Sequence, residues 1–205
     1  VGEIRNMYPT KRAPRIPILP ESFIHSMIAD YTAPQPCEIA IGLHKASVEL
    51  RGFNRAMSPF LILGDAARGK TNMAKVITAQ AMEKGRVFLF DSKDMEMYFY
   101  KGQKNISYIT EQDGIESFIS EVTSISSINK DAFAEAVKSG KNITPKAFYE
   151  TVEPAYIIID DLDDFTTQYQ SALGDLAAVM KTAAESGIGV IATLHSSKAK
   201  GYDEL

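Results

Sequence analysis

One stretch of sequence decides the fold, Gly64-Asp65-Ala66-Ala67-Arg68-Gly69-Lys70-Thr71. A short apolar run at 60–63 comes before it, and a segment compatible with a helix follows at 72–84. The order is therefore strand, glycine-bounded loop and helix, which is the context in which the pattern G-x-x-x-x-G-K-[ST] binds phosphate. Backbone N–H groups of such a loop form an anion-binding concavity, and the positive end of the following helix adds to it.

This stretch predicts a site for ATP and Mg²⁺. We expect the phosphates to contact the loop and the first turn of the helix: Gly64, Asp65, Ala66, Ala67, Arg68, Gly69, Lys70, Thr71 and Asn72. Lys70 would reach the terminal phosphates and serve catalysis, and the Thr71 hydroxyl would complete the shell of the Mg²⁺ ion. A chance match in a surface turn is the alternative interpretation, which the flanking strand and helix oppose.

The composition of the chain argues against several classes of function. The chain has 205 residues, 45% of them hydrophobic, which is enough for one large α/β domain with a real core. Its net charge is −4, with 22 lysines and arginines and no basic stripe, so nucleic acid is not an expected partner. The single cysteine, Cys37, excludes a disulfide framework within the chain and suits a reducing cytosol. No apolar run approaches the roughly 18 residues of a membrane span.

The chain divides into two parts. Residues 1–36 hold six of the nine prolines, so we expect an extended arm or linker that arrives from a preceding domain. Residues 37–205 form the expected ATP-binding domain. Because the chain begins at Val1 without a methionine, we expect it to be a piece of a longer polypeptide.

Beyond residue 36, apolar runs alternate with helical periodicity. Short strands at 38–43 and 47–50 are expected to form an antiparallel edge ahead of the strand at 59–63. Further strands are expected at 86–91, 106–109, 156–159 and 188–192, and helices at 71–84, 112–128, 131–138 and 173–183. Strands that alternate with helices indicate a parallel sheet with helices on both faces. The predicted fold class is α/β, a RecA-like P-loop fold with a mostly parallel central sheet and an antiparallel N-terminal edge.

Two carboxylates, Asp160 and Asp161, follow the apolar strand at 156–159. In enzymes with a phosphate loop, an acid at this strand end holds Mg²⁺, and the next acid commonly orients or deprotonates the attacking water. We therefore assign Asp160, together with Thr71, to the metal and Asp161 to catalysis. The alternative is that both only begin an acidic surface loop. Asp163 and Asp164 are interpreted as helix-start or solvated charges.

Polar residues also follow the last expected strand. Ligands of open α/β sheets bind beyond the carboxyl ends of the strands, so Thr193 could sense the terminal phosphate. His195 is either a ligand or a hydrogen-bonded surface residue, and the sequence leaves both interpretations open.

Four segments in order, 60–71, 87–97, 157–161 and 190–193, resemble the FtsK/SpoIIIE-like ring ATPases. The second segment is the most telling, because that family often has Asp-Pro-Lys after its second core strand, where this chain has Asp91-Ser92-Lys93. The proline-rich entry and the long helical segment at 112–139 look most like the carboxy-terminal ATPase modules of membrane-anchored type VII secretion proteins, the EssC, YukB and EccC group. The resemblance covers about residues 36–197.

The resemblance implies a cytoplasmic ATPase module of a larger membrane-anchored protein, with no direct membrane contact of its own. Its implied partners are neighbouring ATPase domains of the same polypeptide, further copies in a homo-oligomeric ring, and small helical secreted proteins. No residue is identified as the arginine finger of a neighbouring subunit, and Arg51, Arg55 and Arg86 are unranked candidates.

Three positions depart from the family pattern. Asp161 stands where active members usually have Glu, and Leu194 stands where they have the phosphate-sensing Gln. Asp65 puts a negative side chain into a loop built to hold phosphates. These departures imply a domain that binds ATP poorly or hydrolyses it slowly.

Three functions therefore compete. A motor would use ATP hydrolysis to drive export of small folded proteins, whereas a binding module of degenerate ATPase descent would dock an export signal. A DNA translocase is opposed by the acidic charge balance. The departures favour the binding module for this domain, and the polar excursion at 128–150 is the first candidate for its docking surface.

Overall fold

The centre of the molecule is a five-stranded sheet with the strand order β3-β7-β6-β4-β5. The computed structural model describes residues 18–22, 25–33, 37–110 and 112–201. The strands of this sheet are β3 (Phe60–Gly64), β4 (Arg86–Phe90), β5 (Ile106–Ile109), β6 (Ala155–Ile159) and β7 (Gly189–His195). All neighbouring pairs are parallel. The five expected strands and the α/β fold class are confirmed.

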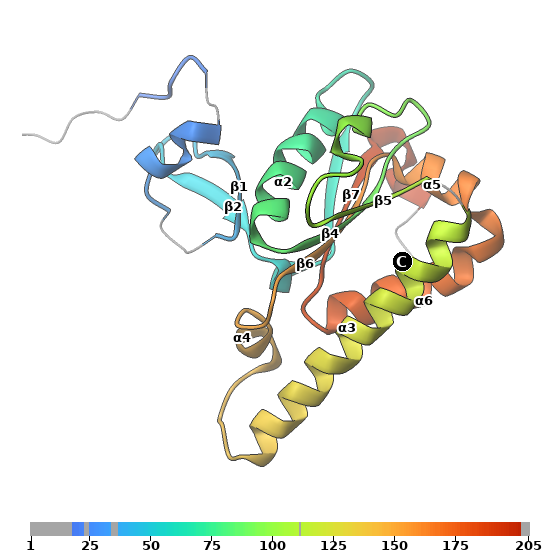
Figure 1. Cartoon of the computed structure of the whole chain (residues 1–205). Coiled ribbons are helices and arrows are strands. Elements are labelled where there is room, and N and C mark those ends of the chain that lie inside the picture. The colour runs from blue at the N-terminus through green and yellow to red at the C-terminus, as the bar shows by residue number, and fades with distance from the viewer. Residues whose placement is uncertain (1–17, 23–24, 34–36, 111, 202–205) are drawn as a thin grey trace, which may run out of the picture.

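Helices cover both faces of this sheet (Figure 1). They are α2 (Lys70–Lys84), α3 (Gln112–Lys138), α4 (Pro145–Tyr149), α5 (Leu162–Gln168) and α6 (Leu173–Glu185). Apolar side chains of α2 pack on one face, and those of α3, α5 and α6 pack on the other. Short 3₁₀ helices complete the described chain: η1 (His25–Asp30), η2 (Arg55–Met57), η3 (Tyr98–Tyr100), η4 (Gln170–Ala172) and η5 (Ser196–Gly201).

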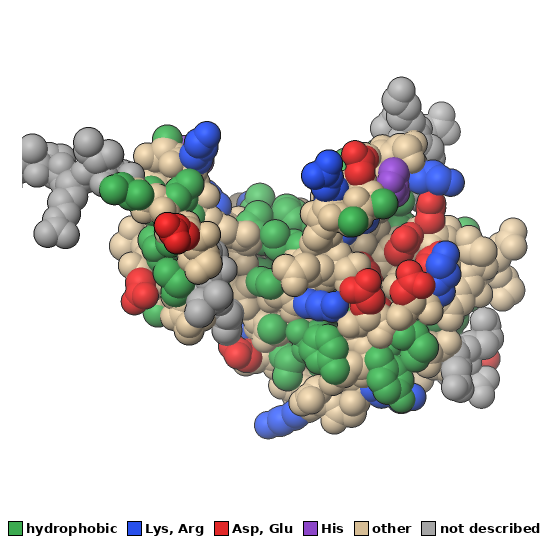
Figure 2. All heavy atoms as spheres, turned by 90° about the horizontal axis from the view of Figure 1, so that it is seen from above, with side chains coloured by type: hydrophobic (Ala, Val, Ile, Leu, Met, Phe, Trp, Pro, Cys, Tyr) green, Lys and Arg blue, Asp and Glu red, His purple; other side chains and the backbone are tan. Residues whose placement is uncertain are grey.

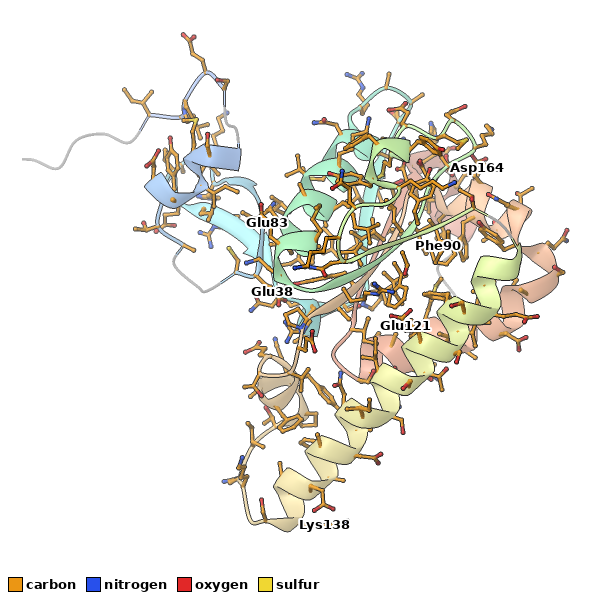
Figure 3. All side chains as sticks on the ribbon, viewed as in Figure 1. Glu38, Glu83, Phe90, Glu121, Lys138 and Asp164 are labelled. Atoms are coloured by element: carbon orange, nitrogen blue, oxygen red, sulfur yellow. The ribbon has the colours of Figure 1, made fainter. Side chains whose placement is uncertain are left out.

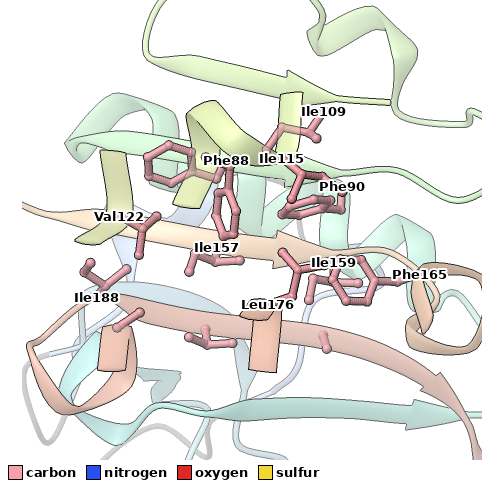
Figure 4. Close-up of a cluster of buried hydrophobic side chains, with 14 of the residues drawn as sticks. Phe88, Phe90, Ile109, Ile115, Val122, Ile157, Ile159, Phe165, Leu176 and Ile188 are labelled. Carbon is pink, nitrogen blue, oxygen red and sulfur yellow. The ribbon is translucent and has the colours of Figure 1, made fainter. Parts of the chain in front are cut away.

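The central strands β4 and β6 are apolar on both sides because both of their faces are covered. All five residues of β6 are buried. Ile157 and Ile159 join the cluster under α3, α5 and α6, which Figure 4 shows, whereas Tyr156 and Ile158 join the cluster under α2. Each such side chain stabilises the fold by roughly 1.5–3 kcal/mol when fully buried, so the sheet is a rigid base for the loops at its ends.

The strand order brings three strand ends together. β7 is the last strand in the chain, yet it lies between β3 and β6. Its register sets His195 beside Gly64 and Ala192 beside Ile159. The loop after β3 and the acidic residues after β6 therefore flank the end of β7 at the carboxyl edge of the sheet.

The segment 112–138 is one continuous helix, α3, where the sequence predicted two helices. Two polar residues near the expected break contact the end of α6. The Asn129 amide donates to the Ser186 carbonyl over 2.9 Å, and the Ser186 hydroxyl donates to that of Ser126 over 2.9 Å. Neither glycine nor proline interrupts 115–138, so nothing ends the helix before Gly140, whose φ is 83°.

The hairpin strands β1 (Ile39–Leu43) and β2 (Leu50–Phe53) pair antiparallel, as expected, but they form a sheet of their own. The second strand begins at Leu50, so the expected strand at 47–50 was placed too early. The hairpin packs on α2, where the Gln80 side chain accepts from the Ala40 N–H over 2.9 Å and donates to the Ala40 carbonyl over 2.8 Å. Gln80 thus satisfies both backbone groups of Ala40, as a neighbouring strand would.

Most of the proline-rich arm lies outside the described residues, so only 18–22 and 25–33 of its first 33 positions have a described structure. Within the described ranges, no helix has both the length and the apolar character needed to cross a membrane.

Candidate functional site

The loop between β3 and α2 contains two residues with a positive φ and ends at the first turn of α2. Gly69 caps α2 with a φ of 82°, a left-handed conformation that glycine adopts without steric cost, and Ala67 has a φ of 56°. The Lys70 ammonium donates to the Asp65 carbonyl over 3.0 Å, so the lysine folds back across the loop. Residues 65–69 are exposed, and the positive end of a 15-residue helix lies directly behind them.

Asp160 lies beside this loop, held by two threonine hydroxyls. Thr193 donates to Asp160 Oδ1 over 2.9 Å, and Thr71 donates to the same oxygen over 3.3 Å. Asp160 is 2% exposed, and its Oδ2 atom has no hydrogen-bond partner in the described part of the protein. The structure therefore brings together the sequence-predicted residues Thr71, Asp160 and Thr193, and it leaves one buried carboxylate oxygen free.

Burial raises the pKa of Asp160 above its ordinary value of 3.8. The Thr193 and Thr71 hydroxyls lower this pKa, whereas the nearby carboxylates of Asp91 and Asp161 raise it. A divalent cation would offset this concentration of negative charge. The described residues contain no cluster of three or more histidine, cysteine or acidic side chains that could hold a metal alone, so a cation here would need the oxygens of a bound phosphate as further ligands.

Asp91 is a buried acid that sequence reasoning did not assign to the site. It directly follows β4, near Asp160, but both of its oxygens are occupied. Oδ1 accepts the Ser92 N–H over 2.9 Å, and Oδ2 accepts the Met97 N–H over 2.9 Å and the Tyr108 hydroxyl over 2.5 Å. Asp91 therefore anchors the loop 92–97. Its place directly after an apolar strand was the signal that could have identified it.

The Asp161 carboxylate is turned toward α5. Its Oδ1 accepts the N–H groups of Asp163 over 3.1 Å and Asp164 over 3.2 Å, so it caps that helix. Its backbone is left-handed, with φ 63° and ψ 91°. Asp163 and Asp164 lie in the first turn of α5, which confirms their interpretation as helix-start charges. In this geometry the capping oxygen is committed to the backbone of α5.

The residues after Thr193 have different surroundings. Leu194 is fully buried, so the position that corresponds to the family's Gln faces the core rather than the loop. His195 is partly exposed at the end of β7, with its Nδ1 2.8 Å from the Ser197 hydroxyl. Ser196 donates to the Asp65 carboxylate. Because Asp65 has this partner, its negative side chain is tied to η5.

Figure 2 looks down on this end of the molecule and shows acidic side chains gathered on it, with lysine or arginine side chains around them. Two ion pairs of the described residues belong to this surface: Lys93 with Asp164 at 3.3 Å and Lys198 with Asp163 at 3.6 Å. Both lysines are largely exposed, so these pairs contribute little to stability.

The three arginine-finger candidates differ in burial and in their ion-pair partners. Arg55 is 2% exposed and paired with Glu38, so burial excludes it. Arg86 pairs with Glu121 at 2.9 Å, and Arg51 pairs with Glu49 at 3.2 Å. Both side chains are partly exposed, at 40% for Arg86 and 47% for Arg51.

A groove of about 670 Å³ lies at the opposite, amino-terminal end of the sheet. One wall is α3, and the other is the segment that enters β6. Figure 3 labels Glu121 on this helix and Lys138 at its far end. The lining residues are Arg86, Glu121, Ile125, Ile128, Asn129, Ala132, Val152, Glu153, Pro154 and Ala155. Ile128 is 63% exposed. The suspected segment 128–150 contributes part of one wall.

No family model matches the chain. It is 32% identical over 197 residues to the ESX secretion system protein YukB of Bacillus subtilis (strain 168), covering 93% of this chain and 13% of that relative. The chain thus spans about an eighth of the relative's length.

The cytoplasmic domain of EssC superposes with a TM-score of 0.78, at 23% identity, over 98% of this chain and 40% of that one. A structure of Thermomonospora curvata EccC (ATPases 2 and 3) in complex with a signal sequence peptide superposes with a TM-score of 0.58, at 19% identity, over 99% of this chain and 37% of that one. These findings confirm the resemblance to ATPase modules of type VII secretion proteins.

Proposed function

From its similarity to the ESX secretion protein YukB, we propose that this chain is a nucleotide-binding ATPase domain of a type VII secretion motor. One observation carries the proposal. The buried carboxylate of Asp160, with a free Oδ2 atom, lies against Thr71 at the start of the helix that follows the phosphate loop. A motif match alone would not require these two residues, which are 89 positions apart, to meet.

ATP with Mg²⁺ is the proposed ligand. The loop from Gly64 to Gly69 and the first residues of α2 would bind the phosphates with backbone N–H groups, and Lys70 would exchange its contact with the Asp65 carbonyl for the terminal phosphates. Thr71 and the Asp160 carboxylate would hold the cation. When bound, the cation supplies charge neutralisation between the phosphates.

We propose that hydrolysis in this domain is slow. The acid that should orient the attacking water, Asp161, uses its Oδ1 to cap α5. The position of the family's phosphate-sensing Gln is occupied by Leu194, which is buried in the core. Both observations support a module that binds ATP but hydrolyses it slowly.

Substrate recognition is the second part of the proposal. A relative with this fold is described in complex with a signal sequence peptide. In this chain, the groove between α3 and the start of β6 offers an apolar wall, with Ile125, Ile128 and Pro154 and an Arg86–Glu121 ion pair at one end. We propose that it docks an apolar segment of a small helical secreted protein.

The wider assembly follows from the same similarity. We propose residues 1–36 as an arm and 37–205 as the ATPase domain, placed in the cytoplasm as part of a larger membrane-anchored protein. Neighbouring ATPase domains of the same polypeptide and further copies in a ring would be its partners. A DNA translocase motor of the FtsK/SpoIIIE type is the alternative, which the net charge of −4 opposes.

Calorimetric titration of the purified chain with Mg·ATP tests the proposal. Lys70→Ala should abolish measurable binding and leave the thermal midpoint unchanged, because Lys70 contacts only the loop. Lys84→Ala is the matched control, since Lys84 is an exposed lysine at the other end of α2. Equal affinity of the wild type and Lys70→Ala would contradict the nucleotide site. Titrations of the same sample with a secretion-signal peptide and with duplex DNA separate the export module from the translocase.

A further inference from the structure

The Thr193 hydroxyl joins the two acidic residues that follow β6. It donates to Asp160 Oδ1 over 2.9 Å and accepts the Asp161 N–H over 2.8 Å. Thr193 reaches both because β7 runs beside β6, and it is 1% exposed. Its contacts are therefore shielded from competing water.

A threonine hydroxyl has a single proton to donate. Thr193 gives this proton to a carboxylate, and it uses a lone pair to accept the Asp161 N–H. The non-bridging oxygens of a nucleotide phosphate are hydrogen-bond acceptors, so sensing the terminal phosphate would require the same proton. The geometry thus commits the Thr193 hydroxyl to the acid and not to the nucleotide.

We propose that Thr193 is a positioning residue for the cation site. It holds the Asp160 carboxylate beside Thr71, where the Mg²⁺ ion that accompanies a bound nucleotide would lie. The inference rests on the proposed function and deepens it, because it replaces phosphate sensing by orientation of the metal ligand. Thr71, the other donor to Oδ1, is farther away at 3.3 Å. When its oxygen turns to the cation, Thr193 is the donor that remains.

The two roles differ in their dependence on the third phosphate. A sensor of the terminal phosphate acts on ATP and is indifferent to ADP. A residue that orients the metal ligand acts on both nucleotides, but only when Mg²⁺ is present. Loss of an outer partner of a metal ligand typically lowers metal affinity about 10- to 100-fold.

The test is calorimetry of the full chain with ATP and ADP, each in Mg²⁺ and in EDTA. Thr193→Val keeps the shape and β-branching of the side chain and removes the donor, whereas Thr193→Ser keeps the donor. Thr78→Val is the control, since Thr78 is a buried threonine on α2 whose hydroxyl donates to the Ala74 carbonyl. Circular dichroism melting confirms that each variant is folded at the temperature of titration.

We expect Thr193→Val to weaken Mg·ATP and Mg·ADP alike, about tenfold or more, and to leave both EDTA titrations unchanged. Thr193→Ser and Thr78→Val should match the wild type. A loss confined to ATP would establish a phosphate sensor and overturn the inference. Equal losses with and without Mg²⁺ would show a purely structural role and also overturn it. A wild type that binds neither nucleotide would instead refute the proposed function, and the inference with it.

Discussion

Two buried charges lie at opposite ends of the central sheet, and their surroundings differ. Arg55 lies at the amino-terminal end, where Glu38 neutralises it and where it donates to the carbonyls of Tyr149 and Val152 at 2.7 Å each. Asp160 lies at the carboxyl end, where hydroxyls contact one oxygen and the other is free. Figure 3 labels Glu38 and Asp164 near these two ends.

This difference distinguishes a charge that is buried to stabilise the fold from a charge that is buried at a candidate binding site. Removing a charge from water is costly unless a partner compensates for it. Arg55 has an ion-pair partner and joins η2 to the chain that enters β6, so its charge serves the fold. Asp160 has no cation near it in the described residues, and the fold tolerates that cost. A buried charge without a counter-charge is the feature expected of a site that a charged ligand completes.

The largest expected effect concerns Arg55. Arg55→Met should lower the free energy of unfolding by about 3–5 kcal/mol, because it leaves Glu38 and two carbonyl oxygens without their partner. Chemical denaturation measures this loss. Arg51→Met is the control, since its pair with Glu49 is exposed and should contribute less than about 1 kcal/mol. Equal losses of unfolding free energy for both arginines would show that the buried Arg55–Glu38 pair contributes no more to stability than an exposed pair.

At the carboxyl end of the sheet, we expect a smaller effect, which increases stability instead of lowering it. Asp160→Asn should raise the thermal midpoint of the nucleotide-free protein at neutral pH, because the uncharged amide avoids the cost of a buried carboxylate. The folded-state pKa of Asp160 lies above its ordinary value. Protonated Asp160 therefore contributes its full stability when the pH is below the pKa that this residue has in the unfolded chain. This contribution is lost as the pH rises through the higher pKa that Asp160 has in the folded protein. The advantage of Asn should shrink as the pH is lowered toward about 4.

Thermal melts of wild type and Asp160→Asn over this pH range provide the measurement. The same substitution should weaken Mg·ATP more than metal-free ATP, because it removes a metal ligand. A lower midpoint for Asp160→Asn at neutral pH would show that the carboxylate stabilises the fold, as Arg55 does.

The smallest effect concerns Asp161. Asp161→Ala should cost about 1 kcal/mol through loss of the α5 cap, whereas Asp161→Asn keeps a capping oxygen and tolerates a positive φ. Phosphate release at saturating Mg·ATP should be low in the wild type and almost unchanged in Asp161→Asn. Asp175→Asn, in the first turn of α6, is the control. Brisk wild-type turnover that collapses in Asp161→Asn would instead identify Asp161 as the acid that activates water.

The contrast also changes the interpretation of Leu194. In the sequence, Leu194 stands where the family resemblance implies a phosphate-sensing Gln. Because Leu194 is fully buried, a Gln there would place an amide in the core, where unpaired polar groups are costly. The residue that does lie at the site is its neighbour Thr193, because side chains of a strand alternate between the two faces.

The sequence by itself located the strands of the central sheet and most of the long helices, and it predicted a phosphate loop. Apolar runs bounded by glycine and polar residues located β4 and β6, because a strand buried on both faces must be apolar throughout. The loop at 64–71 could be predicted to bind phosphate because its glycines and lysine form a local sequence pattern. The acid after β6 was identifiable because it directly follows such a strand.

Only the tertiary structure decided which of these residues meet. The position of β7 between β3 and β6 places Thr193 against Asp160, a contact 33 residues apart that no local pattern encodes. The continuity of α3 depends on polar contacts with α6, and the role of the Asp161 carboxylate depends on where α5 begins. Local propensity and periodicity specify elements, whereas strand order and helix packing specify contacts between distant residues, and the candidate site consists of such contacts.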